Sequence, residues 1–169
     1  AGAPCTERFP AVADATVSSA AASTNFGSAA TLEIERQSAT VQSETLLRFV
    51  VPDLTGFDVR DARVRLTVHR QSGSDSDAGG ALSATAAPWS EATVTFATRP
   101  VPVGVPLGSA GAITTAEGVD FPVAAVVRGA GTYDFVLQSP SVNKARYFSR
   151  EAGESPPALL VTLSASTAP

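Results

Sequence analysis

The chain has 169 residues, of which 44% are hydrophobic and 17% charged, and its formal net charge at pH 7 is −4. This length suffices for one domain that buries roughly 70% of the surface of its unfolded chain, and the composition excludes a disordered protein. No apolar run approaches the ~20 residues of a membrane span, and no long basic cluster favours nucleic acid as a partner. Cys5 is the only cysteine, so an internal disulfide is excluded.

Short segments with the two-residue period of β-strands follow one another along the chain. The clearest lies at residues 62–70, where Val64, Leu66 and Val68 alternate with polar residues. Stretches rich in Pro, Gly and Ser separate the segments, and only residues 123–128 suit a helical turn. We expect about ten strands, at residues 13–17, 32–35, 46–51, 62–70, 82–86, 93–96, 119–121, 132–138, 145–149 and 159–163. This pattern predicts an all-β fold, a jelly-roll-like antiparallel β-sandwich.

The expected sandwich occupies residues 12–164, between an N-terminal tail at 1–11 and a C-terminal tail or linker at 165–169. The sequence starts without methionine, which is typical of a processed chain or a piece of a larger protein. A single lysine among abundant Ser, Thr and Gly is typical of extracellular β modules. We therefore expect a secreted or extracellular protein.

Basic residues on strand faces are the best candidates for a binding surface. Arg63 and Arg65 share the polar face of one predicted strand, and Arg48 lies on the polar face of the preceding strand. Because a short connection joins these strands, we expect them to pair as neighbours. Guanidinium groups suit carboxylates, since two parallel N–H groups match the two carboxylate oxygens. Further cations stand in phase near the C-terminus, at Lys144, Arg146 and Arg150.

If all these strands share one sheet, their cations converge on one concave surface that recognises an acidic ligand. His69, the only histidine, is a further candidate ligand contact on the polar face of the 62–70 segment. The alternative interpretation is that the cations face solvent and pair with Glu33, Glu35 or Asp134 of the same chain.

The sequence offers little support for catalysis. His69 has no partner in a G-x-S-x-G nucleophile motif. Glu33 and Glu35 lie on one strand face, about 7 Å apart by strand geometry, but such pairs are routine on strands. We therefore expect a protein that is not an enzyme.

Two places could hold calcium. The loop at residues 75–80 alternates carboxylates but lacks the closing glutamate of an EF-hand, so we interpret it as an ordinary loop. Asp14, together with backbone carbonyls of the 23–27 loop, could form a structural calcium site of the kind found in other sandwiches.

Aromatic residues bear on the class of ligand. Platforms for neutral glycans need exposed rings, whereas Tyr133 and Tyr147 stand in apolar phase and Trp89 reads as a packing anchor. If a glycan binds, an acidic one is therefore favoured.

Several short motifs stand in a recognisable order. They are Ala13-Asp14, Asn25-Phe26-Gly27, Leu47-Arg48-Phe49, Ala62 to Leu66 (ARVRL), Trp89 to Phe96 (WSEATVTF), Gly131-Thr132-Tyr133 and Ser149 to Ala152 (SREA). Together they resemble the DNRLRE-type domain, also classed as carbohydrate-binding module family 96, over about residues 12–163. Two departures stand out: Phe96 replaces a frequent Trp, and Val50 replaces a common Asp.

The resemblance implies a jelly-roll-like sandwich attached to secreted polysaccharide-active or cell-surface proteins, with alginate the best-known ligand class. Joined to the basic residues, it leads us to expect a non-catalytic module that binds an acidic polysaccharide and targets an attached enzyme or surface domain. The alternative is a structural spacer or adhesion domain of a cell-surface protein.

Overall fold

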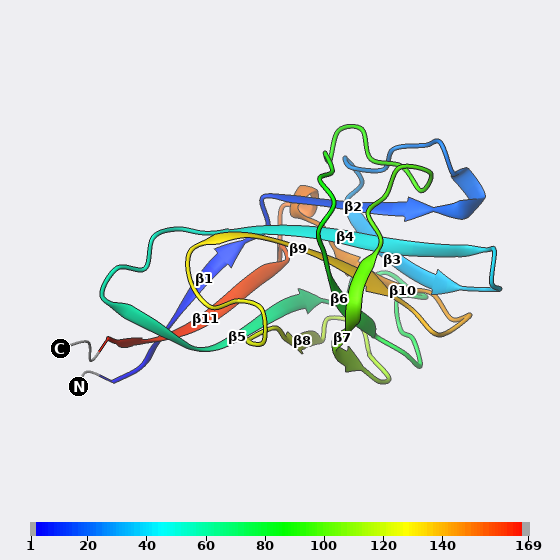
Figure 1. The fold of residues 1–169 in the computed structure, drawn as a ribbon. Coiled ribbons are helices and arrows are strands. Elements are labelled where there is room, and N and C mark those ends of the chain that lie inside the picture. The colour runs from blue at the N-terminus through cyan, green and yellow to red at the C-terminus, as the bar shows by residue number, and fades with distance from the viewer. Residues whose placement is uncertain (1–2, 167–169) are drawn as a thin grey trace.

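The computed structural model describes residues 3–166, which form a β-sandwich of eleven strands in two antiparallel sheets (Figure 1). The first sheet has the order β1-β11-β5-β8, with bounds Cys5–Pro10, Ala158–Ala165, Phe57–Thr67 and Gly118–Pro122. The second has the order β10-β3-β4-β9-β6-β7, with bounds Ala145–Phe148, Thr31–Arg36, Gln42–Val51, Gly131–Gln138, Gly80–Thr85 and Pro102–Ala110, and β2 (Ala13–Ser18) also pairs with β4. The predicted all-β sandwich is confirmed.

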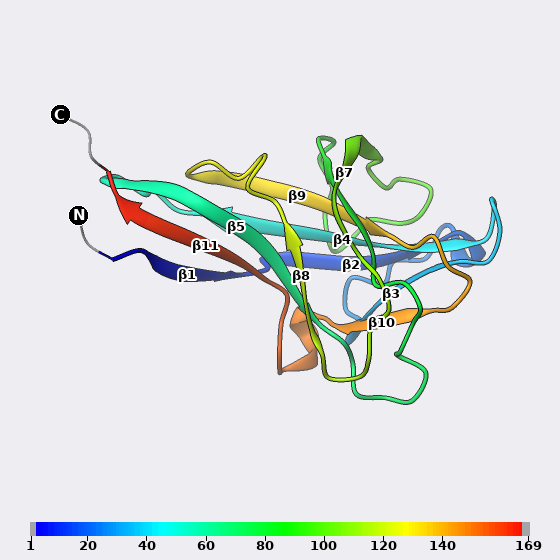
Figure 2. The same cartoon turned by 90° about the horizontal axis from the view of Figure 1, so that it is seen from below.

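The main hydrophobic core lies between the two sheets, which lie one above the other in Figure 1 and overlap in Figure 2, where the four-stranded sheet is seen from below. Leu47 and Phe49 of β4 enter it from the seven-stranded sheet, and Val64 and Leu66 of β5 enter it from the four-stranded sheet. All four are completely buried, as the alternation in the sequence predicts. Alternation therefore identifies correctly which residues of these strands face outward.

A second, smaller core covers part of the outer face of the seven-stranded sheet. The loop between β6 and β7 folds across β2 and β4 and buries Trp89 and Val94 there. Residues 93–96, predicted as a strand, form hydrogen-bonded turns instead, in which the N–H of Val94 donates to the carbonyl of Ser90. Their apolar residues are buried by packing on the sheet and need no strand ladder. The underlying sheet residues are Ala13, Ala15, Val17, Leu46 and Val136.

Two strands occupy residues that were predicted as irregular. The expected N-terminal tail contains β1, which pairs with β11 in register from Cys5 opposite Leu163 to Pro10 opposite Ala158. The Pro- and Gly-rich connection contains β7, an edge strand, where prolines are tolerated because one side makes no ladder. At the other boundary, β11 ends at Ala165, and residues 167–169 lie outside the described part of the chain.

Within residues 3–166, the assigned helices are two short 3-10 helices, η1 (Ser19–Ala21) and η2 (Arg150–Ala152). The helical turn expected at residues 123–128 is a single turn, in which the N–H groups of Val126 and Val127 both donate to the carbonyl of Val123. Among residues 3–166, no helix has the length and hydropathy needed to cross a membrane.

Candidate functional site

The predicted basic residues are divided between the two sheets. β4 pairs with β2, β3 and β9, whereas β5 lies between β11 and β8 in the other sheet. The expectation that these consecutive strands pair is therefore wrong, because the connection at residues 52–56 crosses between the layers (Figure 1). Arg48 and the arginines of β5 do not share a surface.

Arg63 and Arg65 lie on the outer face of the four-stranded sheet, each about 44% exposed. Arg65 donates two hydrogen bonds of 2.7 Å to the carboxylate of Asp120, and Arg63 donates one of 2.7 Å to Asp61. The bidentate contact from Arg65 lowers the pKa of Asp120 below its ordinary value. This part of the surface is an ion-pair network balanced within the chain.

Arg48 serves the second core. Its guanidinium lies 4.9 Å from the centre of the Trp89 ring and donates to Asp134 and to the Trp89 carbonyl. The Trp89 indole N–H donates to the same Asp134 oxygen, at 2.7 Å. Trp89 is 8% exposed, which confirms its prediction as a packing anchor. The three side chains fasten the β6–β7 loop to the sheet.

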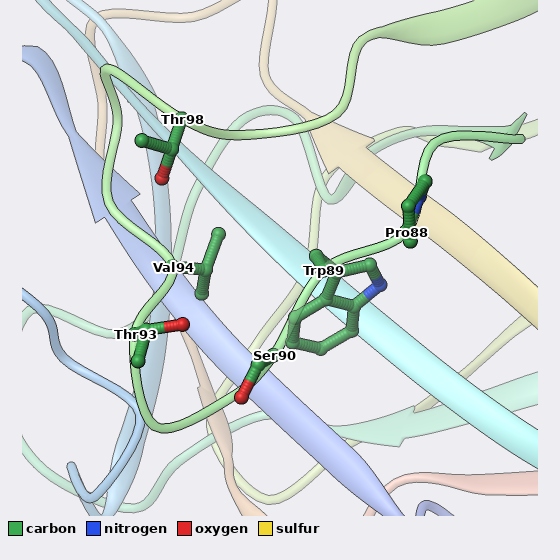
Figure 3. A pocket seen from close by; sticks show the side chains of 6 residues that line it. All are labelled: Pro88, Trp89, Ser90, Thr93, Val94 and Thr98. Carbon is green, nitrogen blue, oxygen red and sulfur yellow. The ribbon is translucent and has the colours of Figure 1, made fainter.

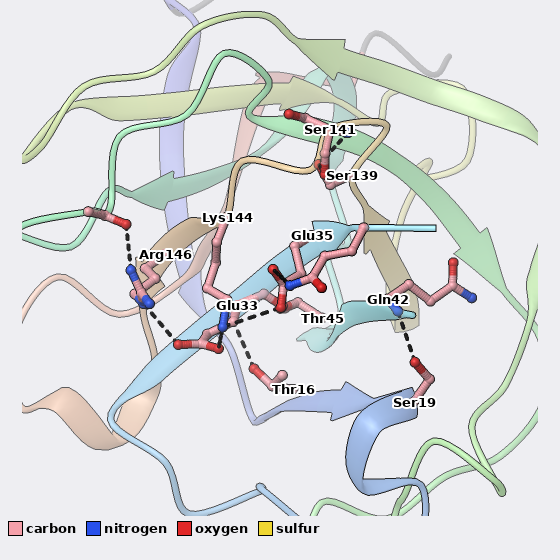
Figure 4. Close-up of polar contacts among 12 residues, drawn as sticks. Thr16, Ser19, Glu33, Glu35, Gln42, Thr45, Ser139, Ser141, Lys144 and Arg146 are labelled. Atoms are coloured by element: carbon pink, nitrogen blue, oxygen red, sulfur yellow. Dashed lines mark hydrogen bonds and ion pairs between the residues drawn. The ribbon is translucent and has the colours of Figure 1, made fainter. Parts of the chain in front are cut away.

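Lys144 and Arg146 converge with two glutamates of β3 on the outer face of the seven-stranded sheet (Figure 4). Lys144 lies 2.8 Å from Glu33 and 3.4 Å from Glu35, and the Arg146 Nε group donates to Glu33 at 2.9 Å. Burial alone would raise the pKa of Glu33, but hydrogen bonds and charge from Lys144 and Arg146 outweigh it and hold that pKa below its ordinary value. Two cations and two carboxylates thus balance each other here.

A groove of about 360 Å³ opens beside this group. Its walls combine hydroxyl groups, the two glutamates, Lys144 and the half-buried ring of Phe26. Such a mixture of one ring and several polar groups suits a sugar, whose C–H faces pack on rings while its hydroxyls form hydrogen bonds. The lining residues are Thr16, Ser18, Ala20, Phe26, Ala29, Thr31, Glu33, Glu35, Ser43 and Lys144.

His69 lies next to the same strand, β10. Its backbone N–H donates to the carbonyl of Arg146, and its ring centre lies 4.5 Å from that of Phe148. The Arg70 guanidinium lies over the Phe148 ring, 5.7 Å from its centre, and forms an ion pair with Glu154. Of the seven predicted ligand contacts, Lys144 and Arg146 meet at Glu33, and His69 adjoins Arg146 through a backbone hydrogen bond.

Arg150 belongs to a separate cluster of charged groups at the start of η2. Its Nη1 donates to Glu91 at 2.8 Å and to Glu151 at 3.1 Å, and its backbone N–H donates to Asp14 at 2.9 Å. Asp14, Glu91 and Glu151 each place a carboxylate oxygen within 4.8 Å of the others. Burial, together with the negative charges of Glu151 and Glu91, raises the pKa of Asp14 to about 7, against the lowering effect of the backbone N–H of Arg150.

The 23–27 loop, expected to offer carbonyls beside Asp14, packs against Glu91. The Asn25 amide donates to the carbonyls of Glu91 and Val94, both at 2.8 Å. Gly27 lies so close that an added Cβ would stand 2.0 Å from the Glu91 carbonyl oxygen. In the other loop considered for calcium, Asp75 accepts from the N–H of Thr115 and thereby joins two loops.

A second hollow, of about 390 Å³, is bounded by residues of the β6–β7 loop (Figure 3). The Trp89 ring on its wall belongs to the second core, where it packs with Val94 and with residues of the sheet. Tyr147 is completely buried and its hydroxyl donates to the carbonyl of Gly79, so its prediction as core is confirmed. Tyr133 packs against the core while partly exposed. The lining residues are Pro88, Trp89, Ser90, Thr93, Val94 and Thr98.

Three site residues escaped the sequence reasoning: Phe26, Glu91 and Glu151. Each stands inside a short motif that was noticed for its order along the chain, but none was assigned a role. A signal for two of them was present in the sequence, since Glu91 lies two residues after Trp89 and Glu151 lies next to Arg150, and both of these neighbours had been singled out. Glu91 and Glu151 lie 77 and 137 residues after Asp14 in the chain, and local sequence patterns do not encode contacts over such separations.

A comparison with protein families gives one result that covers most of the chain. The profile of carbohydrate-binding module family 96 matches residues 5–163. A search of curated proteins finds no match. The match includes β1, which the sequence boundaries had left outside the domain. On this match, the chain belongs to carbohydrate-binding module family 96.

Proposed function

We propose that this module binds an acidic polysaccharide, such as alginate or another polyuronate, in the groove beside Lys144 and does not cleave it. The observation that carries the proposal is a polar groove with one aromatic wall that Lys144 lines directly and that Arg146 adjoins through its ion pair with Glu33. Membership of a carbohydrate-binding family supports a carbohydrate as the ligand, and modules of this family are typically non-catalytic. The cations supply the preference for a carboxylated sugar.

The ion pairs around the groove determine how such a ligand binds. A uronate carboxylate reaches Lys144 by displacing Glu33 or Glu35 from it, so the charge attraction gained is smaller than that of an unpaired cation. This attraction still decides between acidic and neutral sugars, while the Phe26 ring and hydroxyl hydrogen bonds add affinity for either. We expect a modest affinity per site, roughly micromolar to millimolar.

The proposed biological role follows from this weak binding. A weak module becomes effective when it is attached to an enzyme or surface domain, because attachment raises the effective concentration of the second binding event. The proposal therefore places the module in a secreted or extracellular protein, where it holds an attached domain on its polysaccharide.

The experiment is affinity electrophoresis or calorimetry against alginate, polygalacturonate and neutral glucans at low and high salt. The proposal predicts binding to a polyuronate but not to the neutral glucans, and a lower affinity at high salt because exposed charges are screened. Soluble alginate oligosaccharides and a chelator avoid gels of alginate with divalent cations. Binding to a neutral glucan alone would contradict the acidic ligand.

A second candidate function is a structural spacer or adhesion domain of a cell-surface protein. One observation favours it: all six predicted Arg and Lys contacts are engaged in ion pairs within the chain. Under this alternative, none of the polysaccharides is bound at either salt concentration. The pairs are Arg48–Asp134, Arg63–Asp61, Arg65–Asp120, Lys144–Glu33, Arg146–Glu33 and Arg150–Glu91.

A further inference from the structure

Three segments that are distant in the sequence meet at one acidic cluster. Asp14 comes from β2, Glu91 from the β6–β7 loop and Glu151 from η2. One carboxylate oxygen of each lies within 4.8 Å of the other two. Calcium binds carboxylate oxygens at about 2.3–2.6 Å, so two oxygens on opposite sides of one ion are separated by up to about 5 Å. The spacing therefore allows all three oxygens to contact one ion.

A second observation comes from Asp14 itself. The residue is 1% exposed, and its Oδ1 atom is buried without any hydrogen-bond partner. Its other oxygen, Oδ2, accepts from the backbone N–H of Arg150. An unsatisfied buried carboxylate oxygen carries a large desolvation cost, which a directly bound cation removes. The oxygen that lacks a partner thus belongs to the most buried member of the cluster.

The charges of the cluster also favour a bound cation. Three carboxylates face one guanidinium, that of Arg150, whose hydrogen bonds go to Glu91 and Glu151. If all three are ionised, two negative charges remain, which is the charge that one divalent cation neutralises. A hard cation with oxygen ligands and an irregular coordination shell matches this set better than a soft metal, since no Cys or His belongs to it.

The surrounding structure holds the glutamate from the loop in place. The backbone N–H of Asp14 donates to Glu91 Oε1 at 2.8 Å, which fixes the two side chains relative to each other. Asn25 and Gly27 contact the backbone carbonyl of Glu91. Metal ligands that are oriented by neighbouring hydrogen bonds in this way bind more tightly than free side chains.

We propose that Asp14, Glu91 and Glu151 form a calcium site that ties β2, the β6–β7 loop and η2 together. Arg150 then competes with calcium for oxygens of the two glutamates. The site lies apart from the groove, since it shares none of the residues that line it. Its role is to hold the loop that carries Trp89 against the sheet.

The test is calorimetric titration of the chelator-treated protein with calcium chloride, without polysaccharide, together with its melting temperature. The proposal predicts one calcium per chain with Kd of about 1 mM or tighter, as in extracellular modules, and a melting temperature that rises with calcium. Glu151→Gln is expected to weaken binding at least about tenfold. The matched control is Glu154→Gln, which removes the same charge three residues away from an exposed ion pair with Arg70 and leaves binding unchanged.

Two results would overturn the proposal. One is wild-type protein that shows neither heat nor a calcium-dependent melting temperature beyond that of sodium chloride at equal ionic strength. The other is binding of equal affinity in wild type and Glu151→Gln, which would place the ion elsewhere. Asp14→Asn gives a second variant, expected to remove binding. Because no polysaccharide is present, these outcomes are independent of the proposed glycan binding.

Discussion

At the scale of single residues, similar side chains play different parts because of their immediate neighbours. Arg48 and Arg65 both lie opposite aspartates on outer sheet faces, yet one is covered by a loop and the other is open to solvent. A covered ion pair leaves an unpaired charge when one partner is removed, whereas an exposed pair is replaced by water. Strand alternation predicts the same role for both arginines, since it says nothing about a covering loop.

This difference predicts unequal costs of truncation. Arg48→Ala is expected to lower the free energy of unfolding by about 2 kcal/mol, because Asp134 loses its main partner and Trp89 loses the cation above its ring. Arg65→Ala, the matched control, is expected to cost less than about 1 kcal/mol. Urea denaturation measures both. Equal costs would contradict the assignment of Arg48 to the packing of the second core.

At the scale of elements, alternation identifies the face of a strand but not the sheet to which the strand belongs. Alternation correctly predicts which of residues 62–66 face the core and which face outward. It does not predict that β5 belongs to a different sheet from β4. β7 was missed because its prolines mask the strand pattern at an edge. Residues 93–96 alternate like a strand, but the sheet under them already buries their apolar side chains. In each of these segments, the structure depends on contacts between residues far apart in the sequence, which short sequence patterns do not encode.

The β6–β7 loop depends on its contact with the 23–27 loop, which leads to a prediction at this scale. Gly27→Ala is expected to lower the free energy of unfolding by about 2 kcal/mol, since its Cβ would stand 2.0 Å from the backbone oxygen of Glu91. Gly111→Ala, a control with no atom within 4 Å of the added Cβ, is expected to change it by no more than about 0.5 kcal/mol. Thermal or urea denaturation compares the two variants. A Gly27→Ala protein as stable as the control would show that the two loops are not packed as described.

At the scale of the whole molecule, the sandwich separates a groove for a ligand from clusters that hold its loops. The fold class and the alternation of the buried strands could be predicted from the sequence, because a two-residue period and turn residues are local features. The groove could not, because it forms where β2, β3 and β4 meet the 19–29 segment and Lys144, and none of these segments is distinctive alone. Lys144 lies just before β10, so it does not share a strand face with Arg146, but the two cations meet at Glu33, a pairing anticipated only as the alternative.

The charge balance of the groove makes stability depend on pH. Lys144 and Arg146 outweigh burial and lower the pKa of Glu33, so its ionised form stabilises the fold above its ordinary value of 4.5. That contribution is lost as the pH falls through the lowered pKa of the folded state. We expect the stability advantage of wild type over Glu33→Gln to shrink between pH 7 and about pH 3. Urea denaturation across this range measures it, and an advantage that is constant with pH would contradict the assigned ion pairs.

The most direct test of the account is the affinity of Lys144→Ala for alginate oligosaccharides, measured by calorimetry beside wild type and Arg63→Ala. The account predicts that Lys144→Ala weakens binding at least about tenfold, because a cation in the groove is lost and Glu33 and Glu35 are left to repel the ligand. Arg63→Ala, which removes a cation from the other sheet, is expected to leave the affinity unchanged. Weakened binding in Arg63→Ala, with Lys144→Ala equal to wild type, would move the site to the four-stranded sheet and contradict the account.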